Sequence, residues 1–139
     1  MRSSLIWGFL PFLVVSAASA APPDHTLSIT FDYDFRPINS CKIKASKPCV
    51  TQFLLYDITG PKPVLLFTMN APKGEKKART GLTGSGSVPL TDGLHTFALT
   101  AQLVTGEESD PTKCTATATV GKNTKVSLNF SRSQPKRND

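Results

Sequence analysis

Strict alternation of apolar and polar side chains in residues 26–35, TLSITFDYDF, is the feature that most constrains how this chain folds. The apolar side chains all occupy odd positions: Leu27, Ile29, Phe31, Tyr33 and Phe35. Because neighbouring side chains of a β-strand point to opposite faces, this period of two predicts a strand with one buried face. The same alternation returns in residues 95–103 and 126–130, so we expect the chain to be built from β-sheet.

Less regular patterns predict four further strands. Residues 50–58 and 64–69 are apolar on both faces and are separated by TGPKP, which favours a hairpin turn. Residues 114–120 alternate small side chains with threonine, a pattern typical of strands. A glycine- and serine-rich run within residues 82–90 predicts a weaker strand, and residues 71–79 are expected to form a basic loop.

About seven short strands separated by turns, with no helices alternating between them, predict an all-β fold. We expect one domain, an antiparallel β-sandwich over residues 21–130, which is long enough to enclose a hydrophobic core. Residues 131–139, SRSQPKRND, have little to bury and are expected to be a disordered basic tail.

Residues 1–20 have the layout of a secretory signal peptide. Arg2 is followed by an apolar run in residues 5–15 and by the small residues ASA, so we expect cleavage after Ala20. The apolar run has roughly half of the ~20 residues that a transmembrane helix needs. The sequence therefore predicts a secreted or periplasmic protein whose mature chain has no membrane span.

Residues 88–120, VPLTDGLHTFALTAQLVTGEESDPTKCTATATV, resemble a fibronectin type III or similar immunoglobulin-like domain of bacterial secreted proteins. The likeness rests on a turn before an alternating strand, a G-x-E-S-x-P hairpin and a threonine-rich final strand. In that family this segment forms strand F, the FG loop and strand G. The resemblance implies that residues 27–35 are strand B, residues 36–48 the BC loop and residues 50–58 strand C.

The chain departs from that family in two ways, in its aromatic residues and in its first and last strands. The family usually has a tryptophan in strand B, where this chain has Phe31 or Tyr33, and a tyrosine near the start of strand F, where it has His95. No strand is expected before residue 27 in the mature chain, whereas residues 125–130 add one after strand G. That last strand is expected either to take the missing A position or to extend the meander.

Three cysteines, Cys41, Cys49 and Cys114, belong to the exported chain, where an oxidising compartment favours disulfides. The resemblance implies that the BC and FG loops lie at the same end of the sandwich, so we expect the three cysteines to be neighbours. Cys41, on the flexible loop, can reach either of the others. We expect it to form one half of a bridge, with Cys49 preferred over Cys114 as its partner.

Charged side chains border both loops and are candidate contacts for a partner. They are Lys42, Lys44 and Lys47 in the BC loop and Glu107, Glu108 and Asp110 in the FG loop. A second basic group is expected on a different edge of the sandwich. Its members are Lys73, Lys76, Lys77 and Arg79. No aromatic residues interleave with these cations, so we expect no nucleic-acid partner. Carboxylates suit calcium, but we expect the acidic group to be a solvated loop.

No constellation of catalytic or metal-binding residues stands out, so we predict no catalytic residue, no metal site and no cofactor. Of the two histidines, His25 is expected to be exposed in the extended N-terminus and His95 to be packed in its strand. Asp32 and Asp34 are interpreted as the solvated face of one strand. The GSGS run in residues 84–87 lacks the frame of a serine-hydrolase nucleophile.

The sequence therefore predicts a non-enzymatic, exported binding or adhesion-type module that contacts a protein, a carbohydrate or an envelope component through loops or edge strands. One alternative is a small secreted or periplasmic hydrolase or protease inhibitor that uses the cysteine-stapled loop end. Another is a subunit that pairs by strand addition. Loss of Arg2 with the leader lowers the formal net charge from +6 to +5, which suits weak attraction to acidic surfaces.

Overall fold

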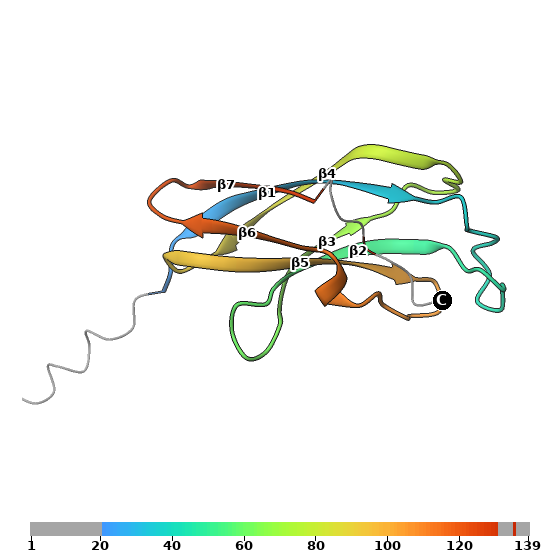
Figure 1. The fold of residues 1–139 in the computed structure, drawn as a ribbon, viewed down its shortest axis with the longest axis horizontal. Helices are drawn as coiled ribbons and strands as arrows, with labels where there is room; N and C mark the ends of the chain where they lie inside the picture. Colours follow the sequence, from blue (N-terminus) through green and yellow to red (C-terminus); the bar gives the residue numbers. More distant parts are fainter. Residues whose placement is uncertain (1–20, 131–134, 136–139) are drawn as a thin grey trace, which may run out of the picture.

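The computed structural model describes residues 21–130 and Pro135, and Figure 1 shows their arrangement. In chain order the elements are β1 (Asp24–Asp34), β2 (Val50–Asp57), β3 (Val64–Asn70), β4 (Ala78–Pro89), β5 (Gly93–Leu103), the short 3-10 helix η3 (Pro111–Lys113), β6 (Thr115–Val120) and β7 (Lys125–Asn129). The prediction of an all-β fold with about seven strands is confirmed. The predicted signal peptide lies outside the described residues, as does the predicted tail except for Pro135, which is buried.

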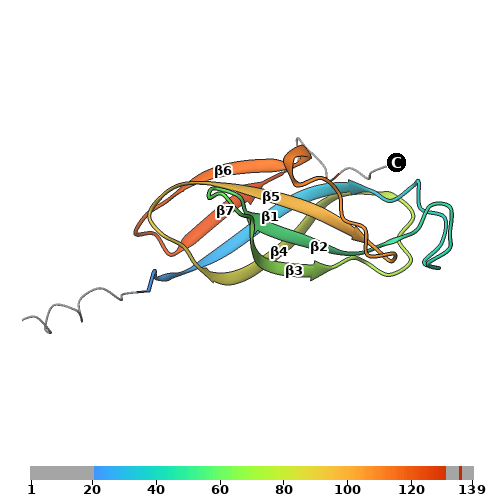
Figure 2. The same cartoon turned by 90° about the horizontal axis from the view of Figure 1, so that it is seen from below.

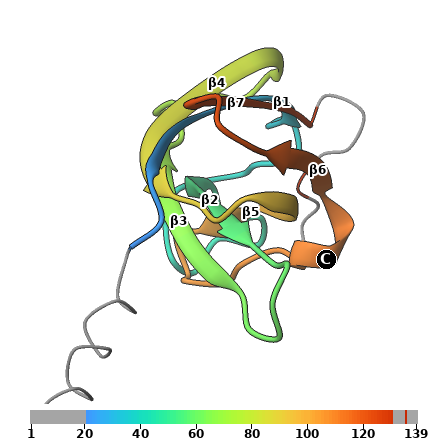
Figure 3. The ribbon, with the colours of Figure 1, turned by 90° about the vertical axis from the view of Figure 1, so that its left-hand side faces the viewer.

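Two sheets, of three and four strands, face each other across one core. The first sheet has the strand order β4-β1-β7 and the second has the order β3-β2-β5-β6. Figure 3 looks along the molecule and shows the two layers. A single cluster of buried side chains from both sheets fills the space between them, so the fold is sandwich-like.

β7 corrects the expectation that all strands pair antiparallel. It takes the free edge of β1 and runs parallel to it, with residues 125–129 opposite residues 26–30. All other pairings of the named strands are antiparallel. The reason is the turn at residues 121–124, which lies at the end of the molecule where β1 begins. A strand that crosses to the other sheet there must run in the direction of β1.

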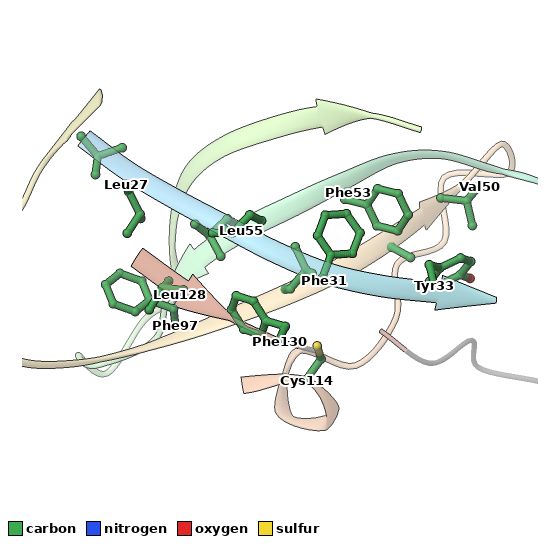
Figure 4. Packing of buried hydrophobic residues seen from close by; sticks show 14 of the residues in the cluster. Leu27, Phe31, Tyr33, Val50, Phe53, Leu55, Phe97, Cys114, Leu128 and Phe130 are labelled. Carbon is green, nitrogen blue, oxygen red and sulfur yellow. The ribbon is translucent and has the colours of Figure 1, made fainter. Parts of the chain in front are cut away.

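Aromatic rings from β1 and β2 meet in the core (Figure 4). Phe31 and Tyr33 of β1 contact Phe53 of β2 edge to face, with ring centroids 4.8 and 5.2 Å apart. Phe35 extends the cluster, 4.7 Å from Tyr33, and none of these four side chains is more than 3% exposed. Burial of a side chain of this size contributes about 1.5–3 kcal/mol. The odd-numbered face of β1 is therefore the inward face, as the alternation predicts.

β4 corrects two expectations about the glycine-rich part of the chain. It begins at Ala78, inside the segment 71–79 that was expected to be a loop. It also runs for 12 residues, longer than the weak strand expected within residues 82–90. Gly86 faces Phe67 of β3, and a Cβ on Gly86 would lie 2.8 Å from the phenyl ring. Gly84 faces Met69 of β3 in the same way. The glycines thus make room for β3 side chains, so that β4 closes this side of the core.

A β-bulge in β4 precedes this close approach. Gly81 has a φ of +68°, a conformation that favours glycine, and its amide donates to the Asp32 carboxylate at 3.0 Å. The register between β1 and β4 shifts at the same point, between Phe31 and Tyr33. Asp32 therefore holds the bulge and is more than a solvated side chain.

Substitution of Gly86 by alanine is expected to lower the free energy of unfolding by about 1–3 kcal/mol, because the new Cβ overlaps the rigid Phe67 ring. Gly84→Ala should cost less, because the flexible Met69 side chain can move aside. Gly60→Ala is the control, since nothing lies within 4 Å of its Cβ position. Chemical denaturation compares the three, and equal stability of Gly86→Ala and Gly60→Ala would contradict this packing.

Candidate functional site

Three connecting segments gather at one end of the sheets, on the right in Figures 1 and 2. They are residues 35–49 between β1 and β2, residues 71–77 between β3 and β4, and residues 104–110 after β5. We call them the disulfide loop, the basic loop and the acidic loop, and their shared location the loop end. The disulfide and acidic loops were expected to meet, and the Val104 amide donates to the Cys49 carbonyl at 2.9 Å.

A disulfide between Cys41 and Cys49 closes the disulfide loop, with 4.7 Å between the Cα atoms. The prediction that these two cysteines pair is confirmed. Backbone hydrogen bonds also cross the base of the loop. The Asn39 amide donates to the Lys47 carbonyl at 2.7 Å, and the Cys49 amide donates to the Ser40 carbonyl at 2.9 Å. Together the cross-link and the hydrogen bonds restrain a segment that has no regular secondary structure.

Cys114 lies elsewhere, which corrects the expectation that all three cysteines are neighbours. After the acidic loop the chain folds back along β5, and the Ser109 amide donates to the Ala101 carbonyl at 2.9 Å. Cys114 then lies opposite Leu99, whose amide donates to the Cys114 carbonyl at 2.9 Å. This position is about four residues, or ~13 Å of strand, from the end of β5 at the loop end. The Cys114 side chain is 0% exposed and belongs to the core (Figure 4).

A pocket of about 780 Å³ lies between the disulfide loop and the basic loop. Its apolar lining includes Phe35, Ile38, Val50, Ala71 and Pro72. The two loops are also joined directly. The Lys76 ammonium donates to the Asn39 carbonyl at 3.5 Å, and the Phe35 amide donates to the Lys77 carbonyl at 3.2 Å. The expectation that the two basic groups belong to different edges is therefore wrong, since both loops border one pocket.

The two loops that form the pocket carry six lysines. They are Lys42, Lys44, Lys47, Lys73, Lys76 and Lys77, and no salt bridge among the described residues involves any of them. The two arginines here are paired, Arg36 of the disulfide loop with Asp34 at 2.8 Å and Arg79 of β4 with Glu75 at 2.6 Å. Eight of the 12 Lys and Arg in residues 21–130 fall within residues 36–47 and 73–79. The positive charge of this part of the chain is thus concentrated around the pocket.

Two of the three acids expected as loop contacts are used within the fold. Glu108 accepts hydrogen bonds from the Tyr56 hydroxyl at 2.7 Å and the Thr100 hydroxyl at 2.9 Å. Burial and the hydrogen bond to Glu108 raise the pKa of Tyr56 to about 12. Asp110 caps η3 by accepting from a backbone amide at 2.9 Å, and this bond lowers the pKa of its carboxyl. Glu107 is exposed.

His25 is 2% exposed, which corrects the expectation of a solvated side chain. Its ring nitrogens face the Pro23 carbonyl at 3.0 Å and the Gly121 carbonyl at 3.1 Å. The imidazole therefore ties the start of β1 to the turn between β6 and β7. The signal for this burial is the parity of the position, since the inward odd-numbered face of β1 begins at His25 and not at Leu27.

His95 is buried in its strand, as predicted, on the half of β5 away from the loop end. Its Nδ1 lies 2.7 Å from an Asp57 carboxylate oxygen, and its Nε2 lies 2.7 Å from the Thr91 carbonyl oxygen. The Thr91 hydroxyl is farther from Nε2, at 3.4 Å. Both ring nitrogens thus lie against oxygen acceptors, and Nε2 lies closer to the carbonyl than to the hydroxyl, so the grouping lacks the geometry of a base that activates the Thr91 hydroxyl. We call this structural grouping the Asp57–His95 clamp.

Comparison of the chain with known protein families, with curated proteins and with solved structures finds no match. Within residues 21–130 and Pro135, no three His, Cys, Asp or Glu side chains are grouped so that they could hold a metal ion. The same part of the chain contains no helix with the length and hydropathy needed to cross a membrane. Function is therefore inferred from the pocket and its charges.

The Asp57–His95 clamp makes stability depend on pH. Burial opposes ionisation of Asp57, but hydrogen bonds from the Thr59 hydroxyl and amide and from His95 lower its pKa below the usual value. A lowered pKa in the folded state stabilises the fold above the unfolded value of about 3.9. This stabilisation is lost as the pH falls through the lower, folded pKa.

Asp57→Asn is expected to lower the free energy of unfolding by about 2 kcal/mol at neutral pH, because it removes a charged hydrogen-bond acceptor. The difference from the parent protein should shrink as the pH falls through the folded pKa, where Asp57 itself becomes neutral. Asp92→Asn, at an exposed position in a turn, is the control and should have little effect. Urea unfolding over this pH range measures both; a difference that stays constant down to the lowest pH would contradict the clamp.

Proposed function

We propose that this chain is an exported, non-enzymatic binding module whose loop end holds an anionic partner. The observation that carries the proposal is a pocket of about 780 Å³ between two loops whose six lysines take part in no salt bridge of the described residues. Lysines that no carboxylate neutralises attract an acidic surface and speed its association. The pocket between them offers that surface a concave place to dock.

The fold class in this proposal is a fibronectin type III or immunoglobulin-like sandwich. Two sheets of three and four strands around one core support it. The segment that carries the resemblance forms the end of β4, then β5, the acidic loop and β6, which is the order of elements expected for strands F and G. The main departure is β7, which lies beside β1 and parallel to it.

The location in this proposal is outside the cytoplasm, either secreted or periplasmic. The signal-peptide pattern of residues 1–20 supports it. The Cys41–Cys49 disulfide supports the same location, because disulfides form and persist in oxidising compartments.

The chemistry of the pocket favours binding over catalysis. No histidine is among its described lining residues, and Glu75 is the one carboxylate there. Hydrogen bonds from Arg79 and from the Lys77 and Lys76 amides lower the pKa of Glu75. A carboxylate held in its ionised form by these donors is a poor general acid or base near neutral pH. The partner is accordingly a protein, a carbohydrate or an envelope component that carries negative charge.

A protease inhibitor is the second candidate function, and one observation favours it. Ile43 is 67% exposed on the disulfide loop, between Lys42 and Lys44. A cross-linked loop that presents exposed apolar and basic side chains in a fixed conformation binds a partner at a low entropic cost. Titration of trypsin and chymotrypsin with the purified protein tests this function; stoichiometric inhibition would support it, and full residual activity would exclude it for these proteases.

Charge reversal at the loop end tests the binding function. The test variant carries Lys44→Glu, Lys47→Glu and Lys73→Glu. The control variant carries Lys62→Glu, Lys122→Glu and Lys125→Glu, at exposed positions away from the loop end. Heparin serves as the polyanion probe, and calorimetry at ~0.1 M salt measures its Kd. Because each reversed charge is worth on the order of 0.5 kcal/mol, the test variant should bind about tenfold more weakly than the control.

The control variant has the same change in net charge as the test variant, so a difference between the two reports the place of the charges and not their sum. Equal weakening of both variants would contradict a binding site at the loop end. Absence of measurable heparin binding by the parent protein would contradict an anionic partner altogether.

A further inference from the structure

We infer that the pocket at the loop end binds an acidic peptide segment of a partner protein and seats one apolar side chain of that segment between the disulfide and basic loops. The inference rests on the proposed function and names the chemistry of its partner. In this arrangement the lysines of the two loops hold carboxylates that flank the apolar side chain.

The apolar residues that line the pocket favour an apolar ligand group. Phe35, Ile38 and Val50 form part of the lining and are 1%, 8% and 6% exposed, so they belong to the core and form an apolar floor of which water reaches little. Ala71 and Pro72 of the basic loop also line the pocket, and they are half-buried and exposed, respectively, so they supply apolar surface that a ligand can cover. An apolar side chain placed against Ala71 and Pro72 removes apolar surface from water on both partners, whereas a purely polar ligand has no apolar surface of its own to bury.

The lysines around the pocket favour carboxylates beside that apolar group. Lys73 and Lys76 line the pocket, and the disulfide loop adds three more lysines. Glu75, the acid among them, is already paired with Arg79 at 2.6 Å. Lysine ammonium groups on flexible stems act as point charges and can donate to carboxylates in many positions. A peptide that alternates acidic and apolar residues can contact both the lysines and the apolar lining.

Other anionic ligands fit the loop end less well. In residues 21–130 every phenylalanine and tyrosine is buried or half-buried, so no fully exposed ring is present for a nucleic-acid base to stack on. A sulfated glycan has charge but no apolar side chain to fill the pocket. A glycan therefore binds the lysines but gains nothing from burial of an apolar side chain in the pocket.

The chain's own acidic segment is also a poor occupant. In the acidic loop, Glu108 is held by Tyr56 and Thr100, and Asp110 caps η3, so a second copy would have to break these bonds to dock its loop. Residues 131–139 carry two arginines and one lysine but a single side-chain carboxylate, the wrong sign for this pocket. A separate acidic partner fits better than a second copy.

Two octapeptides test the inference. Both carry a fluorescein label and the same number of Glu and Asp residues; one has a central leucine and the other a central serine. Fluorescence anisotropy with the disulfide-bonded protein measures each Kd. Because burial of a leucine side chain is favourable, the leucine peptide should bind at least about tenfold more tightly than the serine peptide.

Variants that fill the pocket test whether the preference for leucine arises there. Asn70→Trp places a large side chain at a lining position, and Thr68→Trp places the same side chain two residues away on β3, outside the lining. Asn70→Trp should bind both peptides equally, whereas Thr68→Trp should keep the preference for leucine. Thr51→Trp, at a second lining position, replaces Asn70→Trp if the latter does not fold by circular dichroism.

Either of two results would overturn the inference: equal affinity for the two peptides, or a leucine preference that survives in a folded pocket-filling variant. If the protein forms a concentration-dependent dimer that dissociates when the leucine peptide is added, the occupant of the pocket is a second copy of this chain and the inference of a separate partner is wrong. If neither peptide binds while the lysine variants still differ in heparin binding, the peptide inference fails and the proposed function stands. If both assays fail, the proposed function fails with it.

Discussion

The structure depends on β1, a central strand that pairs with β4 on one edge and with β7 on the other. Its inward side chains, from His25 to Tyr33, run the length of the core, and Phe35, directly after the strand, continues the same face. Phe35 closes the aromatic cluster and also lines the pocket at the loop end. The alternation that forms the core therefore also sets the apolar lining of the pocket, because the strand carries its inward face directly into the disulfide loop.

Register explains why the two basic loops meet. β1 and β4 stay paired to their ends, with Asp34 opposite Ala78, so the disulfide loop and the basic loop leave the first sheet side by side. β2 and β3 are paired with Gln52 opposite Asn70, so the same two loops join the second sheet side by side. The bulge at Gly81 and the glycines that face β3 maintain these registers where β4 closes the core.

The sequence predicts what local alternation controls and misses what depends on long-range pairing. Side-chain pattern predicts the existence of all seven strands, although β4 begins earlier than expected, and the Cys41–Cys49 pairing is the preferred of two alternatives. The parallel pairing of β7, the position of Cys114 beside the middle of β5 and the meeting of the basic loops depend on which strands are neighbours and in which register. The burial of His25 had a local signal, its parity, but a polar side chain near the N-terminus outweighed it in the prediction.

Apolar contact and charge contribute to different steps of binding at the loop end. Exposed lysines attract an acidic partner over about one Debye length, ~8–10 Å at physiological salt, and their contribution falls as salt rises. The apolar lining of the pocket acts at contact and is not screened by salt. A partner that uses both terms associates quickly through the lysines and dissociates slowly through its apolar side chain. Added salt should therefore slow the association of the leucine peptide while changing its dissociation rate much less. A ligand held by charge alone should associate more slowly and also dissociate faster as the salt concentration rises.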